Sequence, residues 1–401
     1  MKNNNEIKYL LNDKNTLNKL LNNKHYNFKD TKTLNQIRNS SFEILRIILM
    51  FLIILSHIKY HTKSLPHLKN NNYHKLINNK YILLRIISNY GKFGDIVFIM
   101  ISGYFSLKRI KFHYIKFILI VSETYTYHYL LLYISNKLKY IYKDVKYFET
   151  DKISQYFPLI SSTGHWFTQH YLLILIFMPF INTGLLNLTY KQYKILVILI
   201  LIFYCLIKAF INICNISSKL FSVTQFLKLL MPYIIGGYIR IYDSKYLLFW
   251  KISGILFFIL TIIFEILFDN LAIKYNEFLW IIIQNELSLQ LYSIFPILSS
   301  IGIICLFKDF KIYNKTINFI SASVLGIYLI HANKNIAPFI YNSIFKTNDY
   351  NGEYFFFKYF LKAIIIFVLC LLIDIIRRFT IGFFIEIILK KIMTNFKNKY
   401  N

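Results

Sequence analysis

The sequence is poor in charged residues and especially in acidic ones. Of its 401 residues, 19 are Asp or Glu, whereas 47 are Lys or Arg. Charged residues of both signs make up only 16% of the chain, hydrophobic residues make up 56%, and the mean hydropathy is +0.44. This composition excludes a soluble domain, whose surface needs more charge. It indicates a polytopic integral membrane protein.

Cysteine, glycine and proline are also scarce. The four cysteines lie in or beside apolar runs and form no Cys-x-x-Cys pair, which predicts small packing residues and no metal site. The chain has 12 glycines and 6 prolines, few for the broken helices with which many transporters bind their substrates, and no internal repeat is visible. A purely transporting protein is therefore the less favoured class.

The excess of basic residues gives a formal charge of +28. These residues lie mainly between apolar runs, where positive flanks face the anionic lipids of the inner leaflet. Nucleic-acid binding requires a soluble basic face with aromatic residues, so no nucleic-acid partner is expected. The lipid bilayer is the expected partner of this charge.

Apolar runs long enough to cross a bilayer recur along the chain. They predict an all-α fold, a polytopic membrane helix bundle with about ten transmembrane helices. The expected spans lie near 42–60, 82–106, 112–134, 166–183, 194–213, 225–242, 246–268, 291–307, 317–340 and 355–377.

Three regions follow from these spans. Residues 1–41 are expected to form a polar cytoplasmic tail without a signal peptide, 42–377 the membrane domain, and 378–401 a basic cytoplasmic tail. Most arginines fall at loops or ends on one side of this arrangement. The positive-inside rule then predicts a multi-pass protein of the cell membrane with both termini in the cytoplasm.

The first span carries three polar groups on one face. His57 follows Arg46 by eleven residues, a rotation of about 1,100°, which is within about 20° of three full turns and about 16 Å along the axis. Glu43 lies one turn before Arg46. Because a charge at mid-membrane costs about 3 kcal/mol, such groups usually face the interior of a bundle. His57 is suited to accept a proton from a hydroxyl group, since its pKa lies near the working pH.

Arg46 has two interpretations. It forms an ion pair with Glu43 at the i,i+3 spacing that merely stabilises the helix, or its planar cation binds an anionic ligand. Lys108 and Arg109, which follow the second span, are expected on the same side of the membrane as Arg46. They are either ordinary positive flanks or a second part of an anion site. A metal pair of His57 and His61 is not favoured, because the HExxH glutamate is absent.

Further polar groups lie within the later spans. Asp95 in the second span, Glu123 and His128 in the third and Glu265 in the seventh are expected to face protein or water. Trp166, which opens the fourth span, is either an interfacial anchor or a site residue. His331 in the ninth is likewise either a packed histidine or part of the site.

Four segments in the right order resemble the membrane acyltransferase-3 family. The first is Phe42-Glu-Ile-Leu-Arg46 with the Arg-x10-His pattern completed by His57, where Leu-Asp-x-Leu-Arg is usual. The second runs from Gly94 to Phe105 and contains Asp95, Ser102 and Tyr104. The others are Gly164-His-Trp-Phe-Thr-Gln-His-Tyr171 with Pro179-Phe-Ile-Asn182, and Ile327-Tyr-Leu-Ile-His331.

The resemblance implies an O-acyltransferase that moves an acyl group, usually acetyl, from a cytoplasmic acyl-CoA to a sugar hydroxyl. The acceptor it implies is a cell-surface or lipid-linked glycan. Acetyl-CoA or another acyl-CoA such as succinyl-CoA is the implied co-substrate, with no permanently bound cofactor and no metal. His57 corresponds to the essential histidine and Arg46 to its partner, with Glu43 holding Arg46.

Other positions correspond less closely to the family. Lys108 and Arg109 stand where many members have paired arginines. The resemblance implies that residues at these two positions bind the acyl donor. The matching segments also make Asp95, Ser102, Tyr104, Trp166 and His331 candidates. The alternatives are a transporter or flippase for a lipid-linked saccharide, and a non-catalytic assembly subunit.

Overall fold

The computed structural model describes residues 39–61, 79–141, 156–159, 165–216, 224–242, 247–275, 279–345, 354–385, 387–388 and 391. In these residues there are helices and no strands, which confirms the all-α prediction. The cytoplasmic tail predicted for 1–41 lies outside the described residues up to residue 38, as does most of the predicted tail 378–401.

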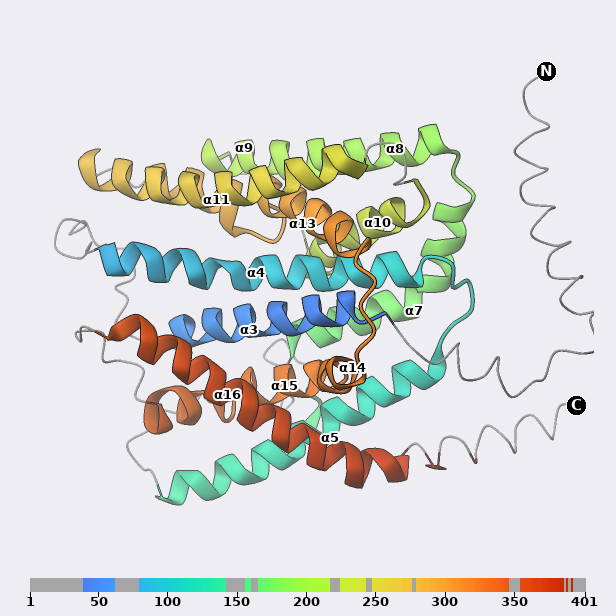
Figure 1. Cartoon of the computed structure of the whole chain (residues 1–401), viewed down its shortest axis with the longest axis vertical. Helices are drawn as coiled ribbons and strands as arrows, with labels where there is room; N and C mark the ends of the chain where they lie inside the picture. Colours follow the sequence, from blue (N-terminus) through green and yellow to red (C-terminus); the bar gives the residue numbers. More distant parts are fainter. Residues whose placement is uncertain are drawn as a thin grey trace, which may run out of the picture.

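The described helices follow one another along the whole membrane domain (Figure 1). The first half contains α3 (Ser41–His61), α4 (Asn79–Ser106), α5 (Tyr114–Ile141), α7 (Trp166–Leu186), α8 (Tyr190–Leu199), the π-helical η2 (Ile200–Ile207), α9 (Lys208–Ile213) and α10 (Gln225–Tyr242). The second half contains α11 (Leu247–Tyr275), α12 (Leu279–Gln284), η4 (Asn285–Leu289), α13 (Ile294–Phe307), α14 (Lys315–Ser321), α15 (Val324–His331), η5 (Phe339–Ile344), α16 (Phe355–Arg377) and η6 (Arg378–Gly382).

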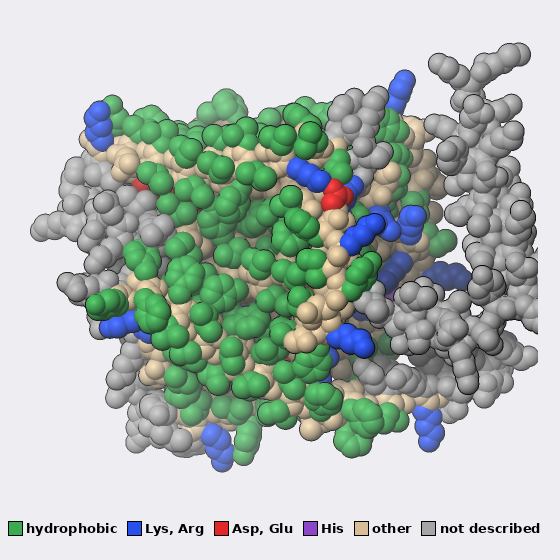
Figure 2. All heavy atoms as spheres, viewed as in Figure 1, with side chains coloured by type: hydrophobic (Ala, Val, Ile, Leu, Met, Phe, Trp, Pro, Cys, Tyr) green, Lys and Arg blue, Asp and Glu red, His purple; other side chains and the backbone are tan. Residues whose placement is uncertain are grey.

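Seven helical stretches among the described residues are long and apolar enough to cross a membrane. Their outer faces carry large apolar side chains, as on α11, where Leu248, Phe249 and Ile252 are 70%, 62% and 58% exposed. Figure 2 shows hydrophobic side chains over most of the visible face. An apolar surface of this extent suits contact with lipid, since a soluble protein rarely exposes such a large patch.

Helix α4 lies at the centre of the bundle, beside α3 and against α10, α11 and α13 (Figure 1). It is 28 residues long but is not among the seven apolar stretches. Its buried residues Ile96, Val97, Ile99 and Met100 are all 0% exposed. Neighbouring helices therefore cover the apolar side chains of α4. The polar side chains of α4 lie between those helices.

Two glycines set the distance between α4 and α10. A Cβ atom on Gly103 would lie 2.0 Å from the carbonyl oxygen of Tyr233, and one on Gly236 would lie 2.0 Å from that of Met100. The two backbones are thus in direct contact, a close approach that small residues allow between membrane helices. This crossing fixes how α10 meets the centre of the bundle.

Gly103→Ala is therefore expected to destabilise the protein by about 1–3 kcal/mol, the usual cost of overpacking. The added methyl group meets backbone, which cannot rotate away. The measurement is the temperature of thermal unfolding in detergent. Gly184→Ala in α7 is the matched control, since nothing lies within 4 Å of its Cβ position and alanine favours helix. Equal stability of the two variants would contradict the tight crossing.

Two expected segment boundaries are wrong. The span expected over 317–340 is broken after Ser321, where the guanidinium of Arg378 donates hydrogen bonds to the carbonyl oxygen of Phe319 at 2.9 Å and to Ser323 Oγ at 3.0 Å. The loop expected over 269–290 is mostly helical, because α11 continues to Tyr275 and the apolar residues after Leu279 form α12. Each difference depends on contacts between helices, which an apolar pattern does not reveal.

Candidate functional site

The start of α3 is anchored to the connection between α13 and α14. Ser40 N donates to the carbonyl oxygen of Ile312 at 2.6 Å, and Asn314 N donates to Ser40 Oγ at 2.9 Å. Asn39 Oδ1 accepts a hydrogen bond from Ser41 N at 3.0 Å and so caps the first turn. These contacts set the position of the helix that carries Glu43, Arg46 and His57.

Glu43 joins Arg46 to the break between α14 and α15. Arg46 Nη1 donates to Glu43 Oε1 at 2.5 Å, and Ser321 Oγ donates to Glu43 Oε2 at 2.5 Å. The Glu43 side chain is 3% exposed and that of Arg46 19%. The ion pair expected from the i,i+3 spacing is present, and both oxygens of the carboxylate are bound.

The Arg46 guanidinium faces α4 and α7. It lies 6.0 Å from the ring centroid of Phe105 and acts electrostatically on Tyr171. The hydroxyl oxygen of Tyr171 accepts a hydrogen bond from Lys116 Nζ at 2.6 Å, and Ser102 Oγ lies 3.5 Å from it. Two cations, a phenol and a hydroxyl from four helices therefore meet near Arg46, an arrangement suited to an anionic or carbonyl-bearing ligand.

His57 lies beside His331. Their ring centroids are 5.0 Å apart at 45°, His57 is half-buried and His331 is 0% exposed. The Nδ1–H of His331 donates to the carbonyl oxygen of Ile327 at 2.6 Å. This bond holds the proton on Nδ1, so the lone pair of the neutral His331 ring is on Nε2.

A series of aromatic rings connects the Arg46 cluster to the two histidines. Tyr171 stacks on Phe167 at 6.3 Å and 17°, and Phe167 meets Tyr328 at 5.7 Å. Tyr328 in turn lies 6.1 Å from His331, which contacts His57. A continuous series of ring contacts from α7 through α15 to His57 on α3 thus begins beside Arg46; it is called below the surface from Arg46 to His57.

The remaining candidates are distributed around this surface. Asp95 on α4 is half-buried and interacts electrostatically with Lys92 and Tyr328. Tyr104 is buried, and its hydroxyl accepts from Arg240 Nη1 at 3.2 Å. Ser102 donates to the carbonyl oxygen of Phe98 at 3.1 Å, in addition to its approach to Tyr171.

Trp166 and the turn that carries Lys108 and Arg109 lie at opposite ends of the surface. Trp166 packs edge-on against Phe167 at 5.8 Å, one residue from the aromatic series. Lys108 and Arg109 are exposed on the turn after α4. That turn is held by Asn182, whose Nδ2 donates to the carbonyl oxygens of Ser106 and Arg109 at 2.7 Å each. The structure therefore does not bring Lys108 or Arg109 into contact with Arg46.

A further histidine closes the end of the surface beyond Trp166. His165 precedes α7 and is 6% exposed, and Asn333 Nδ2 lies 3.5 Å from its Nε2. Burial, together with the nearby charges of His128 and Lys334, lowers the pKa of His165 to about 3. The ring is therefore neutral at physiological pH and serves as an uncharged polar group.

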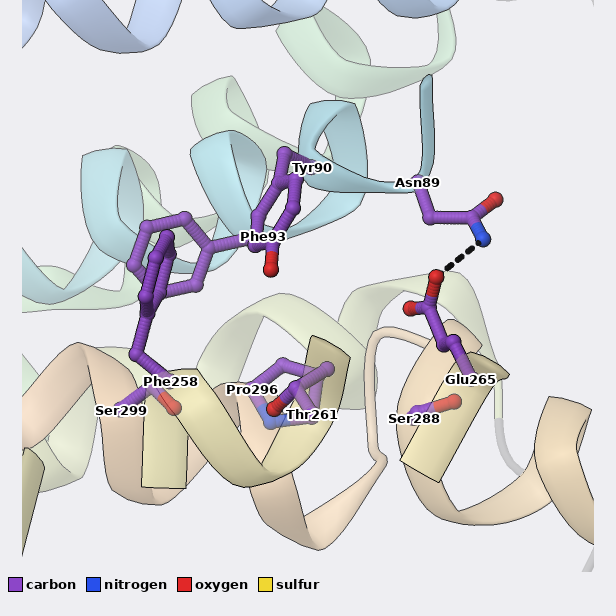
Figure 3. A pocket seen from close by; sticks show the side chains of 9 residues that line it. All are labelled: Asn89, Tyr90, Phe93, Phe258, Thr261, Glu265, Ser288, Pro296 and Ser299. Atoms are coloured by element: carbon purple, nitrogen blue, oxygen red, sulfur yellow. Dashed lines mark hydrogen bonds between the residues drawn. The ribbon is translucent and has the colours of Figure 1, made fainter. Parts of the chain in front are cut away.

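Glu265 lines a separate small pocket between α4, α11 and α13 (Figure 3). Asn89 Nδ2 donates to Glu265 Oε2 at 3.0 Å, while Tyr90, Phe93 and Phe258 form the apolar side. The cavity has room for about one water molecule, too little for a sugar or a thioester. Glu265 is thus a structural polar group, apart from the surface that joins Arg46 to His57.

Sequence reasoning did not single out Lys116, Tyr171 or Tyr328 as site residues. Lys116 resembles an ordinary lysine that flanks a span, and the two tyrosines are among 33 in the chain. The tyrosines do lie within the quoted segments ending at Tyr171 and His331. For Lys116 no sequence signal exists, because its role near Tyr171 depends on how α5 packs against α7.

Comparison with known proteins identifies one family. A family model described as an acyltransferase domain matches residues 39–376, most of the chain. Searches of curated proteins and of solved structures give no significant match. The matched range begins at the anchor of α3 and ends within the last turn of α16, so it includes every helix that contributes to the surface described above.

Proposed function

The chain belongs to the acyltransferase-3 family, a membrane acyltransferase family, and from this membership we propose that it transfers an acetyl group from cytoplasmic acetyl-CoA to a sugar hydroxyl. The acceptor in this proposal is a cell-surface or lipid-linked glycan. The observation that supports it most is the continuous surface from Arg46 to His57, because transfer needs a charged donor site and a base within one bundle.

The donor binds at the Arg46 end. Arg46 and Lys116 offer charge-assisted hydrogen bonds to the phosphates of CoA, and Lys108 and Arg109 attract the nucleotide end from the exposed turn. Glu43 keeps the guanidinium in one orientation through its ion pair. The pantetheine arm then extends along the aromatic side chains of Tyr171, Phe167 and Tyr328 toward the histidines.

The chemical step takes place at His57. Its imidazole accepts the proton of the acceptor hydroxyl as the oxygen attacks the thioester carbonyl carbon. The new C–O bond forms, the C–S bond breaks, and the CoA thiolate leaves with the proton returned by the imidazolium. His331, whose Nδ1 proton is held by the Ile327 carbonyl, positions the His57 ring.

The proposal includes a topology in which the chain crosses the membrane ten times. The seven apolar stretches are joined by α4, by α10 and by the segment containing α14 and α15, which carry more charge or are shorter. Arg109, Arg240 and Arg377 lie at or just after the ends of α4, α10 and α16, the helices that the ten-span topology directs inward. Most basic side chains on the visible face also lie toward the end of the bundle where α4 finishes (Figure 2). Both termini are then cytoplasmic.

The direct test compares cells that express the wild-type protein with cells that express a His57→Ala variant. Mass spectrometry of their surface and lipid-linked glycans is expected to reveal added acetyl groups only with the wild type. A complementary assay measures release of free CoA from acetyl-CoA by protein in proteoliposomes. Translocation of a labelled lipid-linked sugar with no consumption of acetyl-CoA would instead favour a flippase.

Arg46→Ala is expected to raise the KM for acetyl-CoA by about 10–100-fold, which corresponds to one hydrogen bond to a charged group. The control is a second acyl donor, acetyl-pantetheine, which lacks the phosphates of CoA. Its KM is expected to change little. The measurement is the initial rate of thiol release with each donor, and an equal increase for both donors would contradict a phosphate contact.

A further inference from the structure

Three lysines from three helices approach one another inside the bundle. Lys92 lies on α4, Lys208 begins α9 and Lys228 lies in the first turn of α10. Lys228 interacts electrostatically with both of the others. Lys92 and Lys228 each lie eight residues before the contact between Met100 and Gly236, about 12 Å along their helices. They are therefore at similar heights in the bundle.

Lys92 is exposed although α4 packs against α3, α10, α11 and α13. Its charged neighbours belong to three elements, Asp95 on α4, Lys228 on α10 and Glu286 on η4. The Lys92 side chain therefore keeps access to solvent although neighbouring helices enclose most of α4. Lys92, Lys208 and Lys228 are named here the lysine cluster.

No carboxylate lies within ion-pair distance of the lysine cluster among the residues that the structure describes. Glu286 already accepts hydrogen bonds on Oε2 from Asn212 Nδ2 at 2.8 Å and from the Tyr292 hydroxyl at 2.9 Å. The ammonium of Lys228 lies 5.3 Å from the ring centroid of Tyr292. Three ammonium groups thus interact with only two carboxylates, Asp95 and Glu286, and form an ion pair with neither. Because cations at bilayer depth are costly unless their charge is fully compensated, this cluster favours a ligand that brings a further negative charge.

The cluster lies at the height of His57 and far from the donor end. Gly91 packs against Ser56 and Gly94 against Ile53, so the two helices run in opposite directions and Lys92 lies within one turn of His57 in height. Ser106, where α4 ends, is 14 residues further on, about 21 Å along the axis. Phosphates of a donor held near Arg46 and the turn after α4 are thus too remote to be the anion that this cluster binds.

We propose that the lysine cluster binds an acidic group on the acceptor, a carboxylate or a phosphate of the sugar, and so selects acidic glycans. This inference rests on the proposed function. Asn212, Glu286 and Tyr292 border the cluster with groups that bind sugar hydroxyls and rings. Asp95, which interacts with both Lys92 and Tyr328, connects the cluster to the surface that ends at His57.

The test is a binding measurement in lipid nanodiscs without any acyl-CoA. The probes are octyl β-D-glucuronide, octyl β-D-glucoside 6-phosphate and the neutral octyl β-D-glucoside. We expect at least one acidic probe to bind about 10-fold more tightly than the neutral probe, the effect of one charged hydrogen bond. The comparison of the two acidic probes distinguishes a carboxylate from a phosphate.

A Lys92→Gln, Lys228→Gln double variant is expected to lose this preference. Lys274→Gln at the exposed end of α11 removes the same kind of charge and is expected to keep it. If the double variant fails to fold, the single Lys228→Gln variant must weaken acidic binding and Lys92→Arg must retain it. Equal binding of neutral and acidic probes by the wild type, or an unchanged preference in folded variants, overturns the proposal. Because no donor is present, either result is independent of whether the protein transfers acyl groups.

Discussion

Replacing His57 by alanine is expected to slow acyl transfer by about 10²–10⁴-fold, the usual contribution of a general base. The imidazole is half-buried beside His331 at the end of the surface that begins at Arg46, where the acceptor hydroxyl loses its proton in the proposed reaction. The measurement is the initial rate of CoA release in proteoliposomes with saturating acetyl-CoA and a fixed acceptor. Since the side chain is small and half-buried, the variant is expected to remain folded.

His170→Ala provides the matched control. His170 is also half-buried, and its Nδ1 donates to the carbonyl oxygen of Trp166 at 2.6 Å, as His331 does to Ile327. It lies outside the ring series that reaches His57, so its replacement is expected to change the rate little. Turnover by His57→Ala at a rate close to that of the wild type would remove His57 from the role of base.

Arg377→Met is expected to destabilise the protein by about 3–5 kcal/mol, the usual cost of breaking a buried ion pair from one side. Arg377 Nε donates to Asp374 Oδ1 at 2.8 Å, and its Nη2 donates to Glu123 Oε1 at 2.9 Å. The Tyr127 hydroxyl also donates to Asp374 Oδ1, at 2.6 Å. Without the guanidinium, two carboxylates between α5 and α16 lose their cation, and the thermal unfolding temperature is expected to fall by on the order of 10 °C.

Two comparisons separate this effect from a loss of packing. Lys251→Met removes the cation from an ion pair with Asp309, whose side chain is 41% exposed, and is expected to cost less than about 1 kcal/mol. Adding Glu123→Gln and Asp374→Asn to Arg377→Met removes the uncompensated charges and is expected to recover part of the stability. If Arg377→Met were no less stable than Lys251→Met, the buried network would have no structural role.

Local patterns predicted those features that depend on one helix alone. The expected boundaries 225–242 and 355–377 agree with α10 and α16, because each apolar run ends where its helix ends. The pairing of Glu43 with Arg46 followed from a spacing of three residues, which places side chains on one face of any helix. The break after Ser321 was missed, since apolar residues continue on both sides and the group that stabilises the break, Arg378, comes from the start of η6.

The sequence by itself thus determined that this is a helical membrane protein of the acyltransferase-3 family, with Glu43, Arg46 and His57 along one helix. Only the tertiary structure decided that His331 lies beside His57, that Lys116 reaches Tyr171, and that Lys92 and Lys228 lie at similar heights on neighbouring helices. The physical reason is that distances between helices depend on packing. Backbone contacts such as that of Gly103 with Tyr233 set how neighbouring helices cross, and no spacing along the chain encodes which side chains then meet.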